Sequence, residues 1–245
     1  MNFDKEVKER IDAIGCDEPL NATANAFMKA SVDPKYSYNF KWLGRPIIQY
    51  PQDMIAMQEI IWEVKPDLII ETGIAHGGSL IFSASLLELI ASCGGVKGGE
   101  VLGIDIEIRP HNRKAIEEHP MYKRISMIEG SSIAPEVIEK VREKCKGRNR
   151  ILVCLDSNHT HEHVLAELNA YAPLTSVGSF CVVFDTLIED MQENAYPDRP
   201  WGKGNNPKTA VWEWLRSHPE FEIDKSIHQK LLITVAPDGY LRRVR

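Results

Sequence analysis

Five short apolar segments, alternating with helical patterns, constrain the fold of this chain most strongly. The segments cover residues 67–71, 100–106, 124–130, 150–156 and 179–185. Helical patterns lie between them, at residues 77–92, 109–119, 134–145 and 160–171. Short, wholly apolar strands are typical of parallel sheets that are buried on both faces. The alternation therefore predicts an α/β fold with a mostly parallel sheet and helices on both faces.

The C-terminal end of the chain breaks this alternation. Residues 230–244 form two strand-like runs joined by a turn at Pro237, Asp238 and Gly239, which predicts an antiparallel β-hairpin. A parallel sheet closed by one antiparallel hairpin is similar to the Rossmann-like fold of class I methyltransferases, which use S-adenosylmethionine (SAM). We therefore expect residues 66–245 to form a SAM-binding domain of this kind.

Two regions lie outside the predicted sheet. Residues 1–65 combine a first helix, a polar and aromatic loop and a second helix, and we expect this N-terminal segment to act as a lid and in oligomerisation. Residues 186–207 are a long loop rich in Pro, Gly and Asn. Long loops inside compact domains are commonly functional, so this loop is predicted to be a lid.

The bulk composition narrows the choice of partners. The formal net charge of −6 gives no support for binding to nucleic acids or anionic membranes, since both attract basic surfaces. No apolar run approaches the length of a membrane span, and the charged N-terminus does not resemble a signal peptide. The five cysteines lack a CxxC pair and are expected to be reduced. These features predict a cytoplasmic protein with a small-molecule or glycosyl partner.

The turn after the first predicted strand places Glu71 beside a glycine-rich stretch. Its glycine spacing does not match the G-x-G-x-x-G loop that binds the pyrophosphate of a dinucleotide. SAM has no pyrophosphate, and instead needs close backbone approach and acceptors for its ammonium group and ribose hydroxyls. Gly73, Gly77 and Ser79, together with Glu71, fit that task. Asp105 at the end of the second strand is predicted to accept both ribose hydroxyls, because a carboxylate offers only acceptors.

The third predicted strand ends in Gly130, Ser131 and Ser132, where the edge of an adenine ring could be hydrogen-bonded. The alternative is that the glycines in these turns serve only the passage from strand to helix and bind no ligand.

The fourth and fifth predicted strands end in Asp156 and Asp185. Ligands bind beyond the carboxyl ends of strands in open α/β sheets, so these carboxylates should converge beside the cofactor. Two carboxylates without a nearby cysteine favour a hard divalent ion, Mg²⁺ first and Ca²⁺ or Mn²⁺ next. Asn158, Glu189 or Asp190 could complete the ligand set. The alternative is that Asp156 binds the cofactor or caps a helix, and that Asp185 does likewise.

A run of alternating histidines follows the fourth strand: His159, His161 and His163. The run is one residue short of the His-x-His-x-Asp-His metal signature, and a helix cap at Thr160 would turn the rings in different directions. A triple-histidine metal site is therefore not favoured. His159 lies closest to the strand end and is the candidate general base, with a capping or solvated histidine as the alternative.

Together these motifs resemble the cephalosporin hydroxylase/rhamnosyl O-methyltransferase family of SAM-dependent enzymes. The resemblance spans roughly residues 38–240, in the ordered pieces NFKWLGRPIIQYPQDM, IIETGIAHGGSL, GIDIEIR, EGSS, LVCLDSNHTHEHV, VVFDTLIEDM and PWGKGNNPKTAVWEWL. It implies SAM in the loop from Glu71 to Gly77, Mg²⁺ at Asp156 and Asp185, and homo-oligomers built partly from N-terminal elements. The family often has Glu where this chain has Phe184, so a metal ligand is missing or replaced.

The sequence thus predicts a SAM-dependent, Mg²⁺-assisted O-methyltransferase that acts on a sugar hydroxyl of a cell-surface polysaccharide or natural-product glycoside, with Asp156 and His159 in catalytic roles. The first alternative is a metal-dependent hydrolase or oxygenase that uses Asp156, Asp185 and the histidine run. The second is a non-catalytic SAM-binding subunit, for which the departure at Phe184 gives a basis.

Overall fold

The computed structural model describes residues 2–245 and is built around a seven-stranded sheet. The strands are β3 (Leu68–Thr72), β4 (Glu100–Asp105), β5 (Ile125–Glu129), β6 (Ile151–Leu155), β7 (Phe180–Val183), β8 (Phe221–Ile223) and β9 (Tyr240–Arg243). Their order across the sheet is β5-β4-β3-β6-β7-β9-β8. The strands from β5 to β7 run parallel, and β9 runs antiparallel to both β7 and β8. The predicted mostly parallel α/β sheet is confirmed, including each of its five parallel strands.

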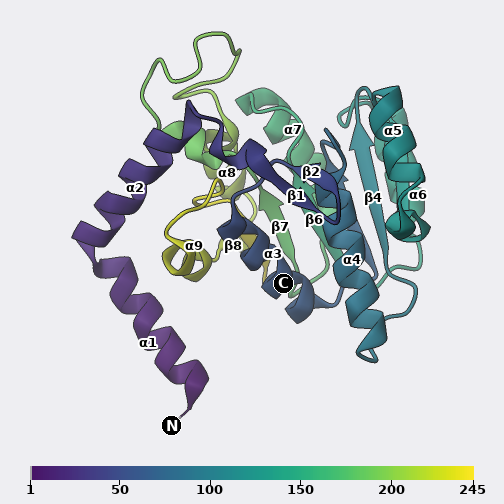
Figure 1. Cartoon of the computed structure of the whole chain (residues 1–245), viewed down its shortest axis with the longest axis horizontal. Coiled ribbons are helices and arrows are strands. Elements are labelled where there is room, and N and C mark those ends of the chain that lie inside the picture. The colour runs from purple at the N-terminus through teal and green to yellow at the C-terminus, as the bar shows by residue number, and fades with distance from the viewer. Residues whose placement is uncertain (1) are drawn as a thin grey trace.

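Helices cover both faces of this sheet (Figure 1). One core contains side chains of α3 (Pro51–Val64), α4 (Gly78–Ser92), α5 (Pro110–Glu117) and α9 (Lys225–Leu231). The other contains side chains of α6 (Pro135–Cys145), α7 (His161–Tyr171) and α8 (Pro207–Leu215). No helix within residues 2–245 combines the length and the apolar character that a membrane crossing needs.

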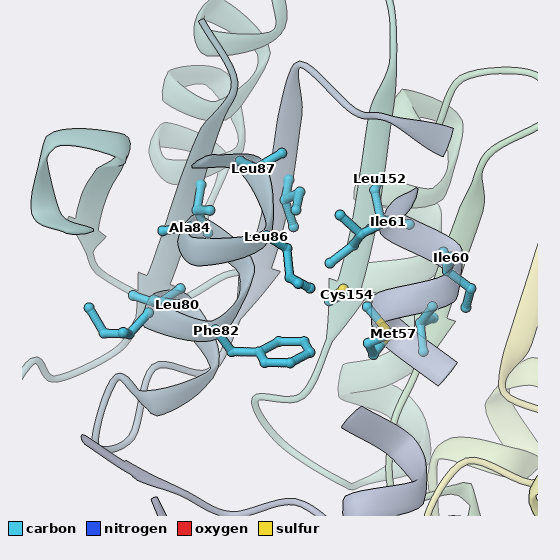
Figure 2. Close-up of a cluster of buried hydrophobic side chains, with 14 of the residues drawn as sticks. Met57, Ile60, Ile61, Leu80, Phe82, Ala84, Leu86, Leu87, Leu152 and Cys154 are labelled. Carbon is cyan, nitrogen blue, oxygen red and sulfur yellow. The ribbon is translucent and has the colours of Figure 1, made fainter. Parts of the chain in front are cut away.

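Successive residues of each strand point to opposite faces, and this alternation positions the first acidic residue of the site. In β3, Ile69 lies in the core under α3 and α4, whereas Ile70 lies in the core under α6 and α7. Figure 2 shows the first of these cores, with side chains that include Met57, Phe82, Leu152 and Cys154. Glu71 has the same parity as Ile69, so its carboxyl group is directed into the α3–α4 face.

The N-terminal segment contains more structure than the sequence indicated. It comprises α1 (Phe3–Cys16), α2 (Glu18–Val32), a short 3-10 helix (Tyr36–Asn39) and the two-stranded sheet of β1 (Phe40–Trp42) and β2 (Arg45–Ile47). In Figure 1, α1 and α2 form an arm along one side of the molecule. Met28 of α2 packs with Tyr50 and with Leu187 and Met191 of the predicted lid loop. The N-terminal segment and the loop therefore meet beside the sheet.

The antiparallel end of the sheet is confirmed, but the predicted hairpin within residues 230–244 is wrong. The partner of β9 is β8, and the two strands are separated by α9. Residues 232–236 form a loop because Asp53 of α3 holds them away from the sheet. Asp53 accepts hydrogen bonds from the hydroxyl of Thr234 and from the backbone N–H of Val235. A backbone N–H held by a buried carboxylate is not available to a strand ladder.

The strand order creates a switch point between β3 and β6. From β3 the chain moves outward to β4 and β5, and it then returns to the other side of β3 as β6. Open α/β sheets bind ligands beyond the carboxyl ends of the strands at such a point. The Asp156 N–H donates to the carbonyl of Thr72 at 3.0 Å, which places the ends of the two strands side by side.

Candidate active site

The loop after β3 is packed tightly against its neighbours. Gly73 and Gly77 have φ values of +90° and +78°, which favour glycine. A Cβ on Gly73 would lie 2.0 Å from the carbonyl oxygen of Asp156, and one on Gly77 would lie 2.3 Å from the side chain of Ile116. The two glycines are therefore required by packing within the chain, and their predicted contact with SAM stays a prediction.

Asp105 fixes the shape of this loop. Its Oδ2 accepts hydrogen bonds from the backbone N–H groups of Ile74 at 2.8 Å and Ala75 at 3.2 Å. Within residues 2–245, its Oδ1 accepts only the N–H of Glu107, at 3.2 Å. A carboxylate oxygen can accept more than one hydrogen bond, so Asp105 can still receive a ribose hydroxyl at Oδ1. That contact stays a prediction.

Glu71 is buried at the same strand end and receives a hydrogen bond from the hydroxyl of Ser79 on α4. Burial raises the pKa of the Glu71 carboxyl group to about 7, and the hydrogen bond from Ser79 opposes the shift only in part. A nearby cation would favour the ionised form.

The structure brings Asp156, His159 and Asp185 together. One ligand atom of each lies within 4.8 Å of the others. The Nε2 atom of His159 is 3.2 Å from Oδ2 of Asp185, and the imidazole meets the edge of Trp201 with ring centroids 4.8 Å apart. Asp156 follows β6 directly, whereas Asp185 adopts a left-handed conformation, with φ of +55°, where the chain turns into the short helix Thr186–Asp190.

Several acidic groups crowd this strand end, and within residues 2–245 neither Asp156 nor Asp185 forms an ion pair with a lysine or arginine. Burial raises the pKa of Asp156 well above its ordinary value, and the negative charges of Asp185, Glu71, Glu167 and Asp53 raise it further. Within residues 2–245, the ion pairs of Asp185 and Glu167 are with histidines. The negative charge gathered at this strand end therefore favours the binding of a cation.

These groups surround a cavity of about 520 Å³ at the switch point. Its lining includes the loop after β3, the Asp156–His159 turn and Asp185. The N-terminal segment contributes Tyr38 and Tyr50 to the same wall, and the lid loop contributes residues that include Tyr196, Arg199 and Trp201. The cavity thus joins the predicted cofactor loop, the predicted metal residues and a partly aromatic wall.

Other predicted residues lie outside this cluster. Gly130, Ser131 and Ser132 are absent from the cavity lining within the described part of the chain, and the hydroxyl of Ser132 is 3.1 Å from Nε2 of His163. His161 is directed toward α8, where Nδ1 is 2.8 Å from the hydroxyl of Thr209. The histidine run therefore divides, with His159 alone beside Asp156 and Asp185 and the other two histidines bound to partners outside that group.

The residues named as possible additional metal ligands have other partners. The Oδ1 atom of Asn158 accepts from the N–H and the hydroxyl of Thr160, both at 2.9 Å. Glu189 accepts from the N–H of Gly204 at 2.7 Å and from the side chain of Asn206 at 2.6 Å, and so anchors the predicted lid loop. Asp190 pairs with Lys208 at 2.7 Å. Within residues 2–245, neither Glu189 nor Asp190 joins the Asp156–His159–Asp185 cluster.

Two buried acids near the site, Asp53 and Glu167, were missed. Asp53 accepts hydrogen bonds from Thr234, Val235 and Tyr240, and burial raises its pKa to about 6. The sequence did contain a signal, because Asp53 falls on the apolar face of its helix, three and four residues before Ala56 and Met57. The carboxylate of Glu167 accepts from Ser157 at 2.7 Å.

Comparison with known proteins identifies the family. Residues 34–244 match the family described as Rhamnosyl O-methyltransferase/CmcI. The rhamnosyl O-methyltransferase of Mycobacterium leprae is 32% identical over 205 residues, covering 82% of this chain and 82% of that protein. That of Mycobacterium tuberculosis is 33% identical over 196 residues, covering 78% and 73%.

The fold is also shared with a solved member of this group. A structure of CmcI with Mg and SAM superposes with a TM-score of 0.59 at 18% identity, covering 85% of this chain and 78% of that one. At this identity the likeness concerns the fold alone. The chain therefore belongs to the rhamnosyl O-methyltransferase/CmcI family of SAM-dependent O-methyltransferases, as its sequence motifs predicted.

Proposed function

We propose that this protein transfers the methyl group of SAM to a hydroxyl of a sugar, with a hard divalent cation held by Asp156 and Asp185. The observation that carries the proposal is the convergence of these two carboxylates in the 520 Å³ cavity, beside the loop after β3. The names of the Mycobacterium relatives support a glycosyl acceptor, and the aromatic side chains of the cavity wall suit the apolar face of a sugar ring.

The residues present fit both groups. For SAM, Ser79 and the loop from Gly73 border the cavity, with Glu71 and Asp105 directly behind it. Contact between adenine and Gly130–Ser132 stays a prediction. For the cation, carboxylate oxygens are the ligands that hard divalent ions prefer, and the burial of Asp156 among other acids leaves negative charge to be neutralised.

When bound, such a cation lowers the pKa of a coordinated hydroxyl and fixes the position of its oxygen. The chain itself orients the reactants and excludes water, because Trp201 and Tyr196 of the predicted lid loop line the same cavity as the loop after β3. Arg199 stacks on Trp201, with its guanidinium carbon 5.2 Å from the ring centroid. His159 borders the same space and stays the predicted general base for a site in which the aspartates alone hold the cation.

Methyl transfer to a panel of glycosides tests the proposal. Calorimetry should show that the purified protein binds S-adenosylhomocysteine. The protein should also transfer the labelled methyl group of SAM to a rhamnoside or a related glycoside. Dialysis against EDTA should abolish turnover, and a divalent cation should restore it. Cofactor binding without transfer to any glycoside, and without a response to divalent ions, would instead support the non-catalytic alternative.

Homo-oligomerisation and a cytoplasmic location also stay predictions. The exposed apolar side chains of Phe3, Leu20 and Phe27 on α1 and α2 support contact between copies of the chain, which light scattering on the purified protein would measure.

A further inference from the structure

The cavity contains two cationic side chains whose charges the proposed chemistry does not use. Arg199 of the predicted lid loop and Lys35, which follows α2, both line it. Other arginines, such as Arg124 and Arg148, are each paired with a glutamate. Within residues 2–245, by contrast, the side chains of Arg199 and Lys35 form no salt bridge and no hydrogen bond, even though Asp33 lines the same cavity. Unpaired positive charges in a binding cavity indicate a ligand that carries an anionic group.

Trp201 holds the guanidinium group of Arg199 near the reacting end of the cavity. The guanidinium carbon is 5.2 Å from the centroid of the Trp201 ring, and that centroid is 4.8 Å from the centroid of the His159 ring. The guanidinium carbon therefore lies at most about 10 Å from the imidazole centroid. The imidazole in turn contacts Asp185 at 3.2 Å. A guanidinium that stacks on an aromatic ring keeps its N–H groups free to bind an anion in its own plane.

This arrangement fits a sugar that carries a phosphate. When one hydroxyl of the sugar lies beside Asp185, the sugar ring fills the space toward Arg199, and a substituent on the far side of the ring reaches the guanidinium group. Lys35 adds a second positive charge to the cavity, with its Nζ atom 5.9 Å from the centroid of the Tyr38 ring. Two cations match the charge of a phosphate monoester or a diphosphate better than that of one carboxylate, and arginine binds phosphate oxygens in pairs.

We propose that the acceptor is a phosphorylated sugar, either a glycosyl phosphate or a nucleoside diphosphate sugar, and that Arg199 and Lys35 bind its phosphate. The inference rests on the proposed function and names the substrate class of the same site. The carboxylate of SAM is the competing anion, because it enters the same cavity in the proposed reaction. Binding of the acceptor must therefore be measured separately from binding of the cofactor.

Three acceptors that share one sugar test the proposal: rhamnose 1-phosphate, a nucleoside diphosphate rhamnose and methyl rhamnoside. The full chain, saturated with S-adenosylhomocysteine and Mg²⁺, is titrated with each by calorimetry. We expect both phosphorylated sugars to bind at least about tenfold more tightly than methyl rhamnoside, and this difference to shrink as the salt concentration rises. Equal affinities for the two phosphorylated sugars would identify the phosphate as the recognised group, and a tighter nucleoside diphosphate sugar would identify that class.

Substitutions at the two cations sharpen the test. Arg199→Gln should reduce the preference for phosphorylated sugars about tenfold, and Arg199→Lys should retain part of it, because it keeps the charge but loses the paired donors. Lys35→Gln should cause a smaller reduction. Arg216→Gln is the matched control, since Arg216 is an exposed arginine that does not line the cavity, and it should leave the preference unchanged.

The outcomes separate this inference from the proposed function. Equal binding of phosphorylated and neutral rhamnosides, or a preference that survives in both Arg199→Gln and Lys35→Gln, would overturn the inference while leaving metal-assisted methyl transfer intact. Weaker binding of S-adenosylhomocysteine to Arg199→Gln, with an unchanged preference among acceptors, would overturn it by assigning this cation to the cofactor. Tight binding of a phosphorylated sugar that is lost in Arg199→Gln would support the inference even if no glycoside accepted a methyl group.

Discussion

Acidic residues at the two ends of the parallel strands differ in their partners. At the amino ends, Glu100 is bound by Arg148 at 2.5 Å and Lys144 at 3.5 Å, and Glu88 by Arg124 at 2.6 Å and Lys123 at 3.0 Å. The hydrogen bonds from Arg124 and Lys123 lower the pKa of Glu88. These carboxylates are neutralised by the chain itself.

At the carboxyl ends, no lysine or arginine within residues 2–245 forms an ion pair with Glu71, Asp156 or Asp185. Burial raises the pKa of Glu71 to about 7 and the pKa of Asp156 well above its ordinary value. The acids at the amino ends are paired with lysine or arginine, whereas those at the carboxyl ends are not. This difference indicates that the carboxyl-end acids are arranged to receive a positive charge from a bound ligand. Both the predicted divalent cation and SAM carry such a charge.

The largest expected effect is on turnover. Asp185→Asn keeps the shape of the side chain but removes one anionic ligand, and should lower kcat by about 100-fold or more, because the cation no longer activates the hydroxyl. Binding of S-adenosylhomocysteine should change little. Glu100→Gln removes a paired acid at the amino ends of the strands and should leave kcat unchanged. Equal losses of kcat in the two variants would show that the two ends of the sheet do not differ in function.

Stability against pH should reveal the same difference. The pKa values of Asp53 and Glu71 are raised to about 6 and about 7, so the folded protein holds protons that the unfolded chain has already lost. The free energy of unfolding of metal-free protein should therefore fall as pH rises from 5 to 8, by about 4 kcal/mol. Carboxylates with lowered pKa values, such as Glu88, finish titrating below this window.

Urea unfolding in EDTA at several pH values measures this effect. Addition of Mn²⁺ and S-adenosylhomocysteine at pH 8 should restore the lost stability, because a ligand that binds only the folded state stabilises it. A free energy of unfolding that stays level or rises between pH 5 and 8 would show that burial does not raise the pKa values of Asp53 and Glu71.

Acceptor binding should depend on the wall of the cavity. Trp201→Ala removes the aromatic surface beside His159 and should raise KM for the glycoside about tenfold, with the affinity for S-adenosylhomocysteine unchanged. Trp212→Ala is the matched control, since Trp212 is 43% exposed on α8 and does not line the cavity. Equal increases in KM would place the acceptor elsewhere.

The smallest expected effect is on stability, where neutralising an acid at the carboxyl ends and one at the amino ends should change the free energy of unfolding in opposite directions. Asp156→Asn removes a buried charge that burial disfavours, and should raise the free energy of unfolding of metal-free protein at pH 8 by about 1 kcal/mol. Glu100→Gln breaks a partly exposed ion pair and should lower it by up to about 1 kcal/mol. Denaturant titrations of both variants give the comparison, and loss of stability in Asp156→Asn would contradict it.

The parallel strands could be predicted because each is a short run of apolar residues with a polar boundary. The hairpin of β1 and β2 gave no such signal: its turn is Leu43-Gly44, with φ of +43° and +87°, and not one of the Asn-Gly or Asp-Gly pairs that mark such turns. Residues 232–236 have the composition of a strand, but a carboxylate from α3 holds them as a loop. Contacts between distant segments decide such cases.

The site was predictable to a similar extent. Asp156 and Asp185 could be placed together because parallel strands end at the same edge of a sheet. The position of His159 beside Asp185 depends on how the turn before α7 is built, with Asn158 binding Thr160, and residue spacing alone does not specify this. Sequence therefore located the two aspartates, whereas the position of His159 beside them required the structure.

Anomalous diffraction from crystals grown with Mn²⁺ and S-adenosylhomocysteine tests the central claim most directly, namely that Asp156 and Asp185 at the switch point hold a divalent cation beside the cofactor. The account predicts one strong manganese peak bonded to Asp156 and Asp185, with the sulfur of the cofactor in the same cavity. A manganese peak elsewhere, or an adenosyl group outside this cavity, would contradict it.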